Sequence, residues 1–490
     1  MNYPIHRLFF FLLAGILFFN PLILGAQSFG FRDYEEDEPE AEKSSFFQGI
    51  SIKLNGGIDA ELKAFFNDFE SGDTIKNAKL GDIFQGNLDL SVSSQVADGV
   101  LKFKLAPVFD GSFSPITIDE AFARVYFGPV NIEGGLRKLT WGKADSFGPL
   151  DIINPLDYSD LSALSDPQSI KLARPLLHIS WNMGMGNTIS NSKLEAVFVP
   201  WFEGHNFADS GRWAPGQITT LPGSVADGIA SSYTLPESER QRIENALEEW
   251  INSGAISGYY PDTQTLEYAQ AGLRFTASMG SSDWGFQYYY GRLARPAVNL
   301  SAEPGFYTGA SIDASRINID IAYNPVHQIG LDFARVIGGL NFRAEAGANI
   351  TSDLDGTNGS IYNPSLFWCI GFDRDVLGID FNVQGTGSIR LSHDKIDDNP
   401  MLDTEAGKDM TSSRITLVLS KKFFRDELEI RARGLWGIED QDFLVMPGIL
   451  WSRNGVSAEL SAGFFGGNKK GELGQYRDNC YIKATLGYRF

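Results

Sequence analysis

The chain ends with Tyr481-Ile-Lys-Ala-Thr-Leu-Gly-Tyr-Arg-Phe490, and this stretch decides the fold. Side chains of an extended chain point alternately to opposite faces. One face therefore carries Ile482, Ala484, Leu486, Tyr488 and Phe490, and the other carries Lys483, Thr485, Gly487 and Arg489. One apolar face, one charged face and an aromatic carboxy terminus are typical of the closing strand of a transmembrane β-barrel.

The same alternation recurs along the chain, for example in residues 50–62, 381–391, 428–436 and 456–464. A soluble sandwich does not need so many strands with charge opposite the apolar face. Short and long connections alternate between these strands, as in outer-membrane barrels, whose periplasmic turns are short. Residues 313–336 keep one parity across Asn324-Pro325, which predicts one long strand that extends beyond the membrane on the outer side.

Together these patterns predict an all-β fold, a transmembrane antiparallel β-barrel of about 18 strands. We expect both termini in the periplasm and long outer loops that include one helix. An even number of strands requires the two termini to lie on the same side.

The amino terminus has the features of an export signal. His6 and Arg7 precede the apolar run 8–19, which is too short to span a bilayer, and Gly25-Ala26 offers small residues for cleavage. We therefore expect a signal peptide at 1–26, an acidic disordered periplasmic segment at 27–48 and the barrel at 49–490. The expected location is the outer membrane, with outer-membrane lipid and the barrel-assembly machinery as partners. A net charge of −20 argues against nucleic-acid binding.

The charged face of the predicted strands carries both signs. The positions expected to face inward are Arg124, Arg137, Arg274, Arg343, Arg390, Arg431, Arg433 and Arg489, and Asp59, Glu61, Glu133, Glu195, Asp320, Asp332, Glu345 and Glu459. Such a density of charge is tolerable only where water reaches it. The sequence thus predicts a wet channel, although most of these residues serve simply to solvate and brace its wall.

The third outer loop, from Trp141 to Pro175, is unusually apolar for an exposed segment. Its apolar side chains need cover, so the loop is expected to fold inward and narrow the channel, or else to pack as a rim. The candidate constriction residues are Lys143, Asp145, Asp151 and Asp157 of this loop and Arg124, Arg137, Arg343, Arg431, Arg433 and Glu345 of the wall.

The fourth outer loop is the longest and is expected to contain the helix. Pro236 suits a first helical turn, and Ile243, Leu247 and Trp250 or Ile251 form an apolar stripe at helical spacing. This stripe is expected to pack against the barrel mouth or another loop. The helix could therefore act as a lid or plug.

The stretches 137–161 and 171–181 resemble a large family of porin-like outer-membrane barrels, catalogued as domain of unknown function 1302. The family-like elements are Trp141, Gly142 and Asp145, followed by Asn154, Pro155 and Asp157. Residues 282–296 and 322–347 continue the resemblance, whereas Tyr323-Asn-Pro-Val326 lacks the acidic residue of the family pattern. The resemblance implies an outer-membrane barrel and leaves its function open.

Catalytic and metal-binding motifs are not found in the sequence: His residues are scattered, and nucleophile-turn or phosphate-loop patterns do not occur. We therefore expect no enzyme activity, cofactor or metal. The leading hypothesis is a porin-like channel through which small polar or charged solutes diffuse passively. The alternatives are an adhesin or ligand-binding barrel and an uptake channel for hydrophobic compounds. Tyr488 and Phe490 are expected to act as an assembly signal.

Overall fold

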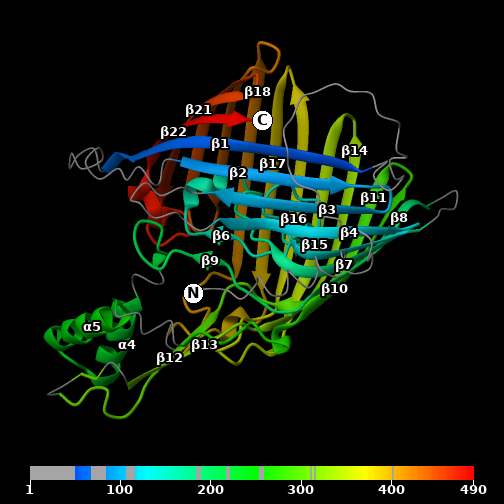
Figure 1. Ribbon diagram of the computed structural model, residues 1–490. Coiled ribbons are helices and arrows are strands. Elements are labelled where there is room, and N and C mark those ends of the chain that lie inside the picture. Colours follow the sequence, from blue (N-terminus) through cyan, green and yellow to red (C-terminus); the bar gives the residue numbers. More distant parts are fainter. Residues whose placement is uncertain are drawn as a thin grey trace, which may run out of the picture.

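The structure is a computed structural model (Figure 1). It describes residues 50–67, 84–105, 116–183, 189–216, 221–252, 259–309, 312–313, 316–399 and 402–490. The predicted signal peptide and acidic segment lie outside these residues. Among the described residues, no helix is both long and apolar enough to cross a bilayer.

Eighteen strands form one antiparallel sheet that closes on itself. They are β1 (Ser51–Phe65), β2 (Phe84–Ser93), β3 (Ala97–Leu105), β4 (Thr117–Phe127), β5 (Val130–Arg137), β7 (Arg174–Asn182), β8 (Ile189–Val199), β10 (Gln270–Met279), β11 (Ser282–Arg292), β14 (Pro325–Ile337), β15 (Leu340–Thr351), β16 (Ser365–Val376), β17 (Ile379–Arg390), β18 (Thr411–Phe423), β19 (Leu428–Gly437), β20 (Asp442–Arg453), β21 (Val456–Gly467) and β22 (Tyr481–Arg489). Closure comes from β1, which pairs with β2 on one side and with β22 on the other. The predicted barrel and its strand number are confirmed.

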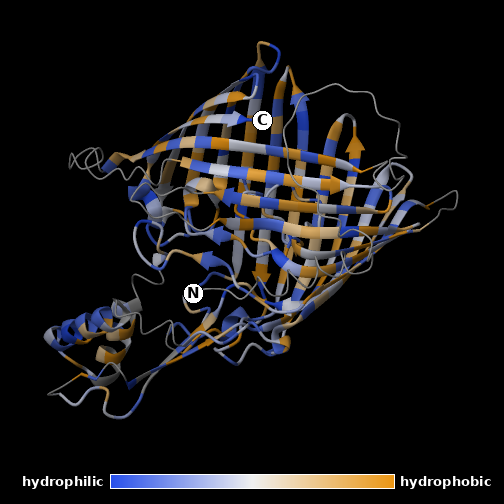
Figure 2. Cartoon of the chain, viewed as in Figure 1, coloured by the Kyte–Doolittle hydropathy of each residue, from blue (hydrophilic) through white to orange (hydrophobic). Residues whose placement is uncertain are grey.

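Hydrophobic and hydrophilic residues alternate along the strands, as the colours in Figure 2 show. On β22, Ile482, Leu486 and Tyr488 are exposed on the outer surface, whereas Lys483 forms an ion pair with Glu61 of β1. Large apolar side chains are likewise exposed on most other strands. The barrel thus has an apolar outer belt and a charged lumen, the reverse of a soluble protein.

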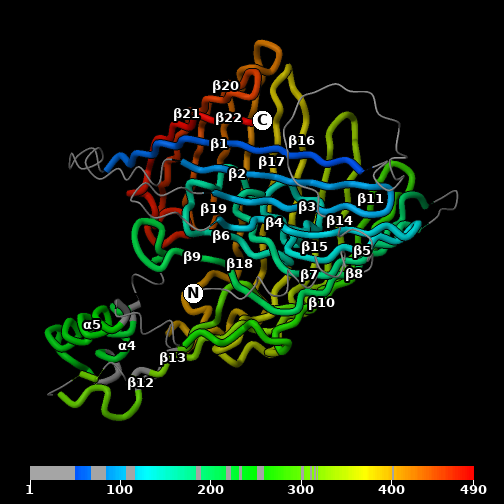
Figure 3. The backbone as a smooth tube through the Cα atoms, in the orientation of Figure 1, coloured from blue at the N-terminus to red at the C-terminus, as the bar shows by residue number. Residues whose placement is uncertain are grey.

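Short and long connections alternate around the barrel, so one end carries short turns and the other carries the long loops (Figure 3). β1 begins and β22 ends on the short-turn side. At this seam the backbones of Gly56 and Phe490 exchange two hydrogen bonds, of 3.0 and 3.1 Å.

The prediction of one long strand over residues 313–336 is wrong. The structure has two strands, β13 (Ile317–Ala322) and β14, and β13 pairs with β12 (Ala297–Ala302) in a separate ribbon. The chain changes partners at Asn324, whose side chain is held by Ser360 and Tyr362. The alternation of apolar residues continues across Asn324 because β13 and β14 both bury every second residue. The two strands bury these residues against different neighbours. Asp320 therefore lies on the ribbon and not in the lumen.

In the described part of the longest loop there are two helices, α4 (Leu221–Tyr233) and α5 (Glu237–Asn252), where the sequence indicated one. Ile243 and Leu247 of α5 are fully covered by α4 and by Ile319 and Ile321 of the ribbon. Helices and ribbon project beyond the strands as a small unit with its own core (Figure 1). The apolar stripe thus packs against another loop and not against the barrel wall.

Candidate functional site: a loop inside the lumen

The segment between β5 and β7, residues 138–173, is closed at its base by one side chain. The amide oxygen of Asn154 accepts a hydrogen bond of 2.8 Å from the backbone N–H of Leu139. Its amide nitrogen donates to the backbone carbonyls of Arg137 and Leu172, at 2.9 and 2.8 Å. Leu172 N–H also donates to the Pro155 carbonyl. The family-like residues Asn154 and Pro155 therefore hold the two ends of the loop together.

Trp141 anchors the start of the loop in a buried apolar cluster of the wall. Its ring meets that of Tyr289 on β11 edge to face, with the centroids 6.2 Å apart. Leu139, Ile153 and Val199 belong to the same cluster. Because the Trp141 ring is buried in this cluster, the chain that follows β5 turns towards the lumen.

Glu345 of β15 binds the backbone of the loop that follows Trp141. Its carboxylate, on a side chain only 3% exposed, accepts hydrogen bonds from the N–H groups of Lys143, Ala144 and Leu150. Several N–H groups converging on one carboxylate form strong, charge-assisted bonds. The loop turn is therefore built around a wall residue that lies about two hundred positions away in the sequence.

Three glutamines on β11, β14 and β17 of the same wall continue this attachment. Gln384 of β17 accepts hydrogen bonds from the N–H groups of Asp145 and Ser146, at 2.9 and 3.2 Å. Gln287 of β11 and Gln328 of β14 donate to the carbonyls of Leu150 and Pro149, at 2.9 and 3.0 Å. We call Gln287, Gln328, Glu345 and Gln384 the anchor row. It fixes residues 143–150 against the inner wall of β11–β17.

At the tip of the loop, charged groups remain accessible to water. Asp145 forms an ion pair with Arg343 of β15 and accepts a hydrogen bond of 2.7 Å from Asn382. The side chains of Asp145 and Arg343 are 31% and 25% exposed. Arg433 of β19 donates to the Ser146 hydroxyl at 2.9 Å. The ammonium of Lys143 lies 4.0 Å from the carboxylate of Asp283. The structure thus brings five predicted residues together here: Lys143, Asp145, Arg343, Glu345 and Arg433.

Asp151 and Asp157 lie elsewhere and have structural partners. Asp151 pairs with Lys171, a buried lysine of the same loop, and burial raises the pKa of the Asp151 carboxyl. Asp157 accepts hydrogen bonds from Ser159 N–H and the Asn206 amide. Neither carboxylate faces the tip formed by Asp145.

The second half of the loop crosses to the other side of the lumen. Leu161, Leu164 and Ile170 are buried in one cluster with Leu444 of β20 and Tyr481 of β22. Asp160 forms an ion pair of 2.6 Å with Lys63 of β1. The loop therefore contacts the walls at β11–β19 and at β20–β1, and its apolar residues find cover inside the barrel.

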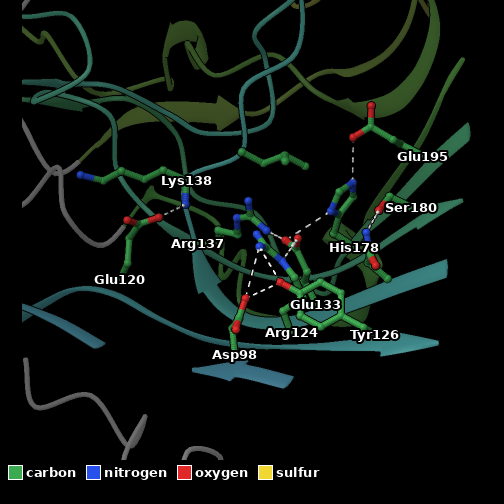
Figure 4. A network of polar contacts seen from close by, with 12 residues as sticks. Asp98, Glu120, Arg124, Tyr126, Glu133, Arg137, Lys138, His178, Ser180 and Glu195 are labelled. Carbon is green, nitrogen blue, oxygen red and sulfur yellow. Dashed lines mark hydrogen bonds and ion pairs between the residues drawn. The ribbon is translucent and has the colours of Figure 1, made fainter. Parts of the chain in front are cut away.

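Arg124 and Arg137 belong to a chain of charges on the wall of β3–β8 (Figure 4). Both form ion pairs with Glu133, which also lies 3.4 Å from a ring nitrogen of His178. The other ring nitrogen of His178 lies 3.1 Å from Glu195. Positive and negative groups alternate along this chain, so the wall carries mixed charge with each carboxylate compensated.

The remaining predicted residues are Arg431 of β19 and, at the seam, Tyr488 and Phe490. Arg431 forms an ion pair of 2.6 Å with Glu459. Tyr488 and Phe490 are exposed on the outer surface with their rings 6.4 Å apart. No group of three or more His, Cys, Asp or Glu side chains within the described ranges is arranged to hold a metal ion.

Of the anchor row, Glu345 was among the predicted site residues, and the three glutamines were not. Parity indicates that Gln287, Gln328 and Gln384 face the lumen, but nothing in their spacing tells which loop they meet. A run of polar amides at the same level on neighbouring strands is the only available signal.

No model of a protein family matches the sequence, and no curated protein matches it. Among solved structures, the chain is similar to Wzi of Escherichia coli, described as a carbohydrate-binding outer-membrane barrel involved in group 1 capsule assembly. The identity is 11%, the TM-score is 0.44, and the match covers 89% of this chain and 84% of Wzi. OmpF of Salmonella typhi, solved with daunomycin, matches with 9% identity, a TM-score of 0.41 and coverage of 90% and 98%. A mutant of the Rhodopseudomonas blastica porin matches with 12% identity, a TM-score of 0.36 and coverage of 90% and 100%. At these values the fold rests on the observed strand pairing.

Proposed function

We propose that this protein is an outer-membrane, porin-like channel for passive diffusion of small polar or charged solutes. The short turns would face the periplasm and the long loops the exterior. The observation that carries the proposal is the attachment of residues 143–150 to the anchor row. A loop held across a charged lumen restricts passage by size and by the field of its walls, and no chemical step is needed. We also propose membership of the family catalogued as domain of unknown function 1302, on the motifs around Trp141 and Asn154.

Conductance of single channels in planar bilayers tests the proposal. The variant Glu345→Ala with Gln384→Ala removes acceptors for five loop N–H groups, those of Lys143, Ala144, Asp145, Ser146 and Leu150. We expect wild-type protein to give stable unitary currents and this variant to give larger or noisier ones. Arg316→Ala, on the outer ribbon, is the control and should conduct like wild type. Absence of unitary currents from correctly folded wild-type protein contradicts the proposal.

Complete deletion of the loop is a poorer test, because Leu161 and Leu164 cover apolar wall residues such as Leu444. Their loss would leave an apolar patch in the lumen and change folding as well as conductance.

A second candidate function, ligand binding by the outer loops, is supported by the projecting unit of α4, α5 and the β12–β13 ribbon. It has its own buried core, including Val225, Ile243 and Phe306. Excision of the unit separates the two candidates, since a channel would keep its unitary conductance. Uptake of hydrophobic compounds is less well supported. The apolar loop residues Leu150, Ile153 and Leu161 are buried in packing contacts and therefore offer no surface to a ligand.

A further inference from the structure

Three basic residues stand on the outer surface of alternate strands at the short-turn end: Arg335 on β14, Arg374 on β16 and Lys421 on β18. Each lies two residues before the end of its strand, at Ile337, Val376 and Phe423 respectively. Only β15 and β17 separate these strands in the sheet. The three side chains therefore lie along one arc of the rim, and we call them the basic row.

The strand pattern places the basic row on the apolar face. Arg335 shares the parity of Leu331, which is 46% exposed, and Arg374 that of Ile370, also 46% exposed. Lys421 shares the parity of Ile415. Arg374 lies between two acidic residues of the opposite parity. Asp373 points to the lumen, where it pairs with Arg343 and Asn341, and Asp375 accepts a hydrogen bond from the N–H of Gly378 in the turn.

Within the described part of the chain, none of the three forms an ion pair with a carboxylate. Arg374 extends over the neighbouring turn at Gly339. Lys421 lies 5.7 Å from the centre of the Phe423 ring and 3.4 Å from the Leu377 carbonyl. On the inner wall, by contrast, Arg343 and Arg431 form ion pairs with carboxylates.

Each basic residue is also flanked along its strand by apolar residues of the same face. Phe333 and Ile337 flank Arg335; Phe372 and Val376 flank Arg374; Leu419 and Phe423 flank Lys421. A cation within an apolar lipid-facing belt is costly unless it reaches headgroups or water at the interface. Two guanidinium groups suit phosphate, which they bind in a bidentate manner. The equivalent position on β20 is Trp451, a residue type favoured at this depth.

We propose that the basic row is a binding site for the phosphate headgroups of anionic phospholipid in the leaflet at the short-turn end. Lipid here would fix the depth and tilt of the barrel on one side only. The inference goes beyond solute passage and rests on the proposed function only in requiring that the barrel spans a bilayer.

Reconstitution of the full-length protein tests this site. Purified protein is inserted into vesicles of phosphatidylcholine with or without phosphatidylglycerol, and lipids that remain bound after extraction are identified by native mass spectrometry. The test variant is Arg335→Gln, Arg374→Gln and Lys421→Gln. The control, Lys469→Gln, Lys470→Gln and Arg477→Gln, removes the same charge from an exposed outer loop. An Arg335→Lys and Arg374→Lys variant keeps the charge but not the bidentate geometry.

We expect wild type and control to retain phosphatidylglycerol in preference to phosphatidylcholine. The triple test variant should lose this preference by at least tenfold, because each basic residue near an anionic surface contributes about fivefold in affinity. The lysine variant should retain part of it. Inorganic phosphate should compete only weakly with phosphatidylglycerol for the basic row, because the lipid also makes apolar contacts with the barrel surface.

Equal retention by the test variant and wild type overturns the site, and so does full displacement by inorganic phosphate. Flotation of the protein with vesicles is measured in parallel. Failure of wild type to float would contradict the membrane proposal itself, whereas flotation without lipid preference would contradict only the basic row.

Discussion

The carboxylate of Glu345 lies beside Gly142, in the space where any other residue would place its Cβ. Gly142 also has a φ of +94°, a conformation that L side chains rarely adopt. The same carboxylate binds the N–H groups of the next two residues. The close contact between Gly142 and Glu345 is therefore the point at which the loop turns into the lumen.

Gly142→Ala should destabilise the protein through both steric overlap and backbone strain. Gly211→Ala is the matched control, because Gly211 has a φ of +80° but open space around its Cα. We expect the control to cost about 1–2 kcal/mol for strain alone. Gly142→Ala should cost about 1–3 kcal/mol more, the usual range for overpacking. Urea unfolding in lipid vesicles measures both; equal losses would mean that Glu345 moves aside freely.

Asp145→Arg should shift ion selectivity towards anions, because it reverses a partly exposed charge at the loop tip beside Arg343. The reversal potential across a bilayer in a salt gradient measures this shift. Its size should fall as salt rises, since screening shortens to about 3 Å at 1 M. Glu267→Arg makes the same charge change on an exposed outer segment and should leave selectivity unaltered. A similar shift in both variants would remove Asp145 from the narrow point.

The stability of the fold should depend on pH through the carboxyl group of Glu472, which lies in the last outer loop. Its carboxylate joins Arg295 of another loop to Arg414 near the start of β18. The Arg295 guanidinium, together with that of Arg414, holds the pKa of Glu472 well below its usual range. A carboxyl with a depressed folded-state pKa stabilises the fold above its unfolded pKa of about 4.3. That contribution is lost as the pH falls towards the folded-state value.

Glu472→Gln should accordingly lower the midpoint of thermal unfolding at neutral pH. The difference from wild type should shrink below about pH 4, where the unfolded carboxyl is protonated. Glu248→Gln, on the exposed side of α5, is the control and should show little difference at any pH. A constant difference between Glu472→Gln and wild type across this range would contradict the ion-pair explanation.

Deletion of Phe490 should impair assembly more than the properties of assembled protein. Its ring packs over Gly56 of β1, and its backbone completes the seam. An aromatic end residue sits at the interface girdle, where barrels close. The amount of heat-modifiable barrel in the membrane fraction measures assembly, and unitary conductance measures the assembled protein. Unchanged yield would contradict this role; Phe490→Tyr should behave like wild type.

The sequence determined the barrel because its side-chain period is unambiguous. Residues such as Ile482 and Lys483 must face opposite sides of a strand, and one side of the sheet must meet lipid. Repetition of this pattern, with alternating short and long connections, fixes the strand count and puts both ends of the barrel on one side. The apolar content of the third loop showed that this loop needed cover, but it left inward folding and packing as a rim as alternatives.

Only the tertiary structure decided which residues meet across the lumen. Glu345 and Lys143, or Asp160 and Lys63, are joined by closure of the sheet and not by local pattern. The same limit explains the error at Asn324: parity reports that alternate residues are buried, but not whether the barrel or a separate ribbon buries them. It also explains why Asp151 became a buried partner of Lys171 while Asp145, six residues earlier in the same loop, kept a face towards water.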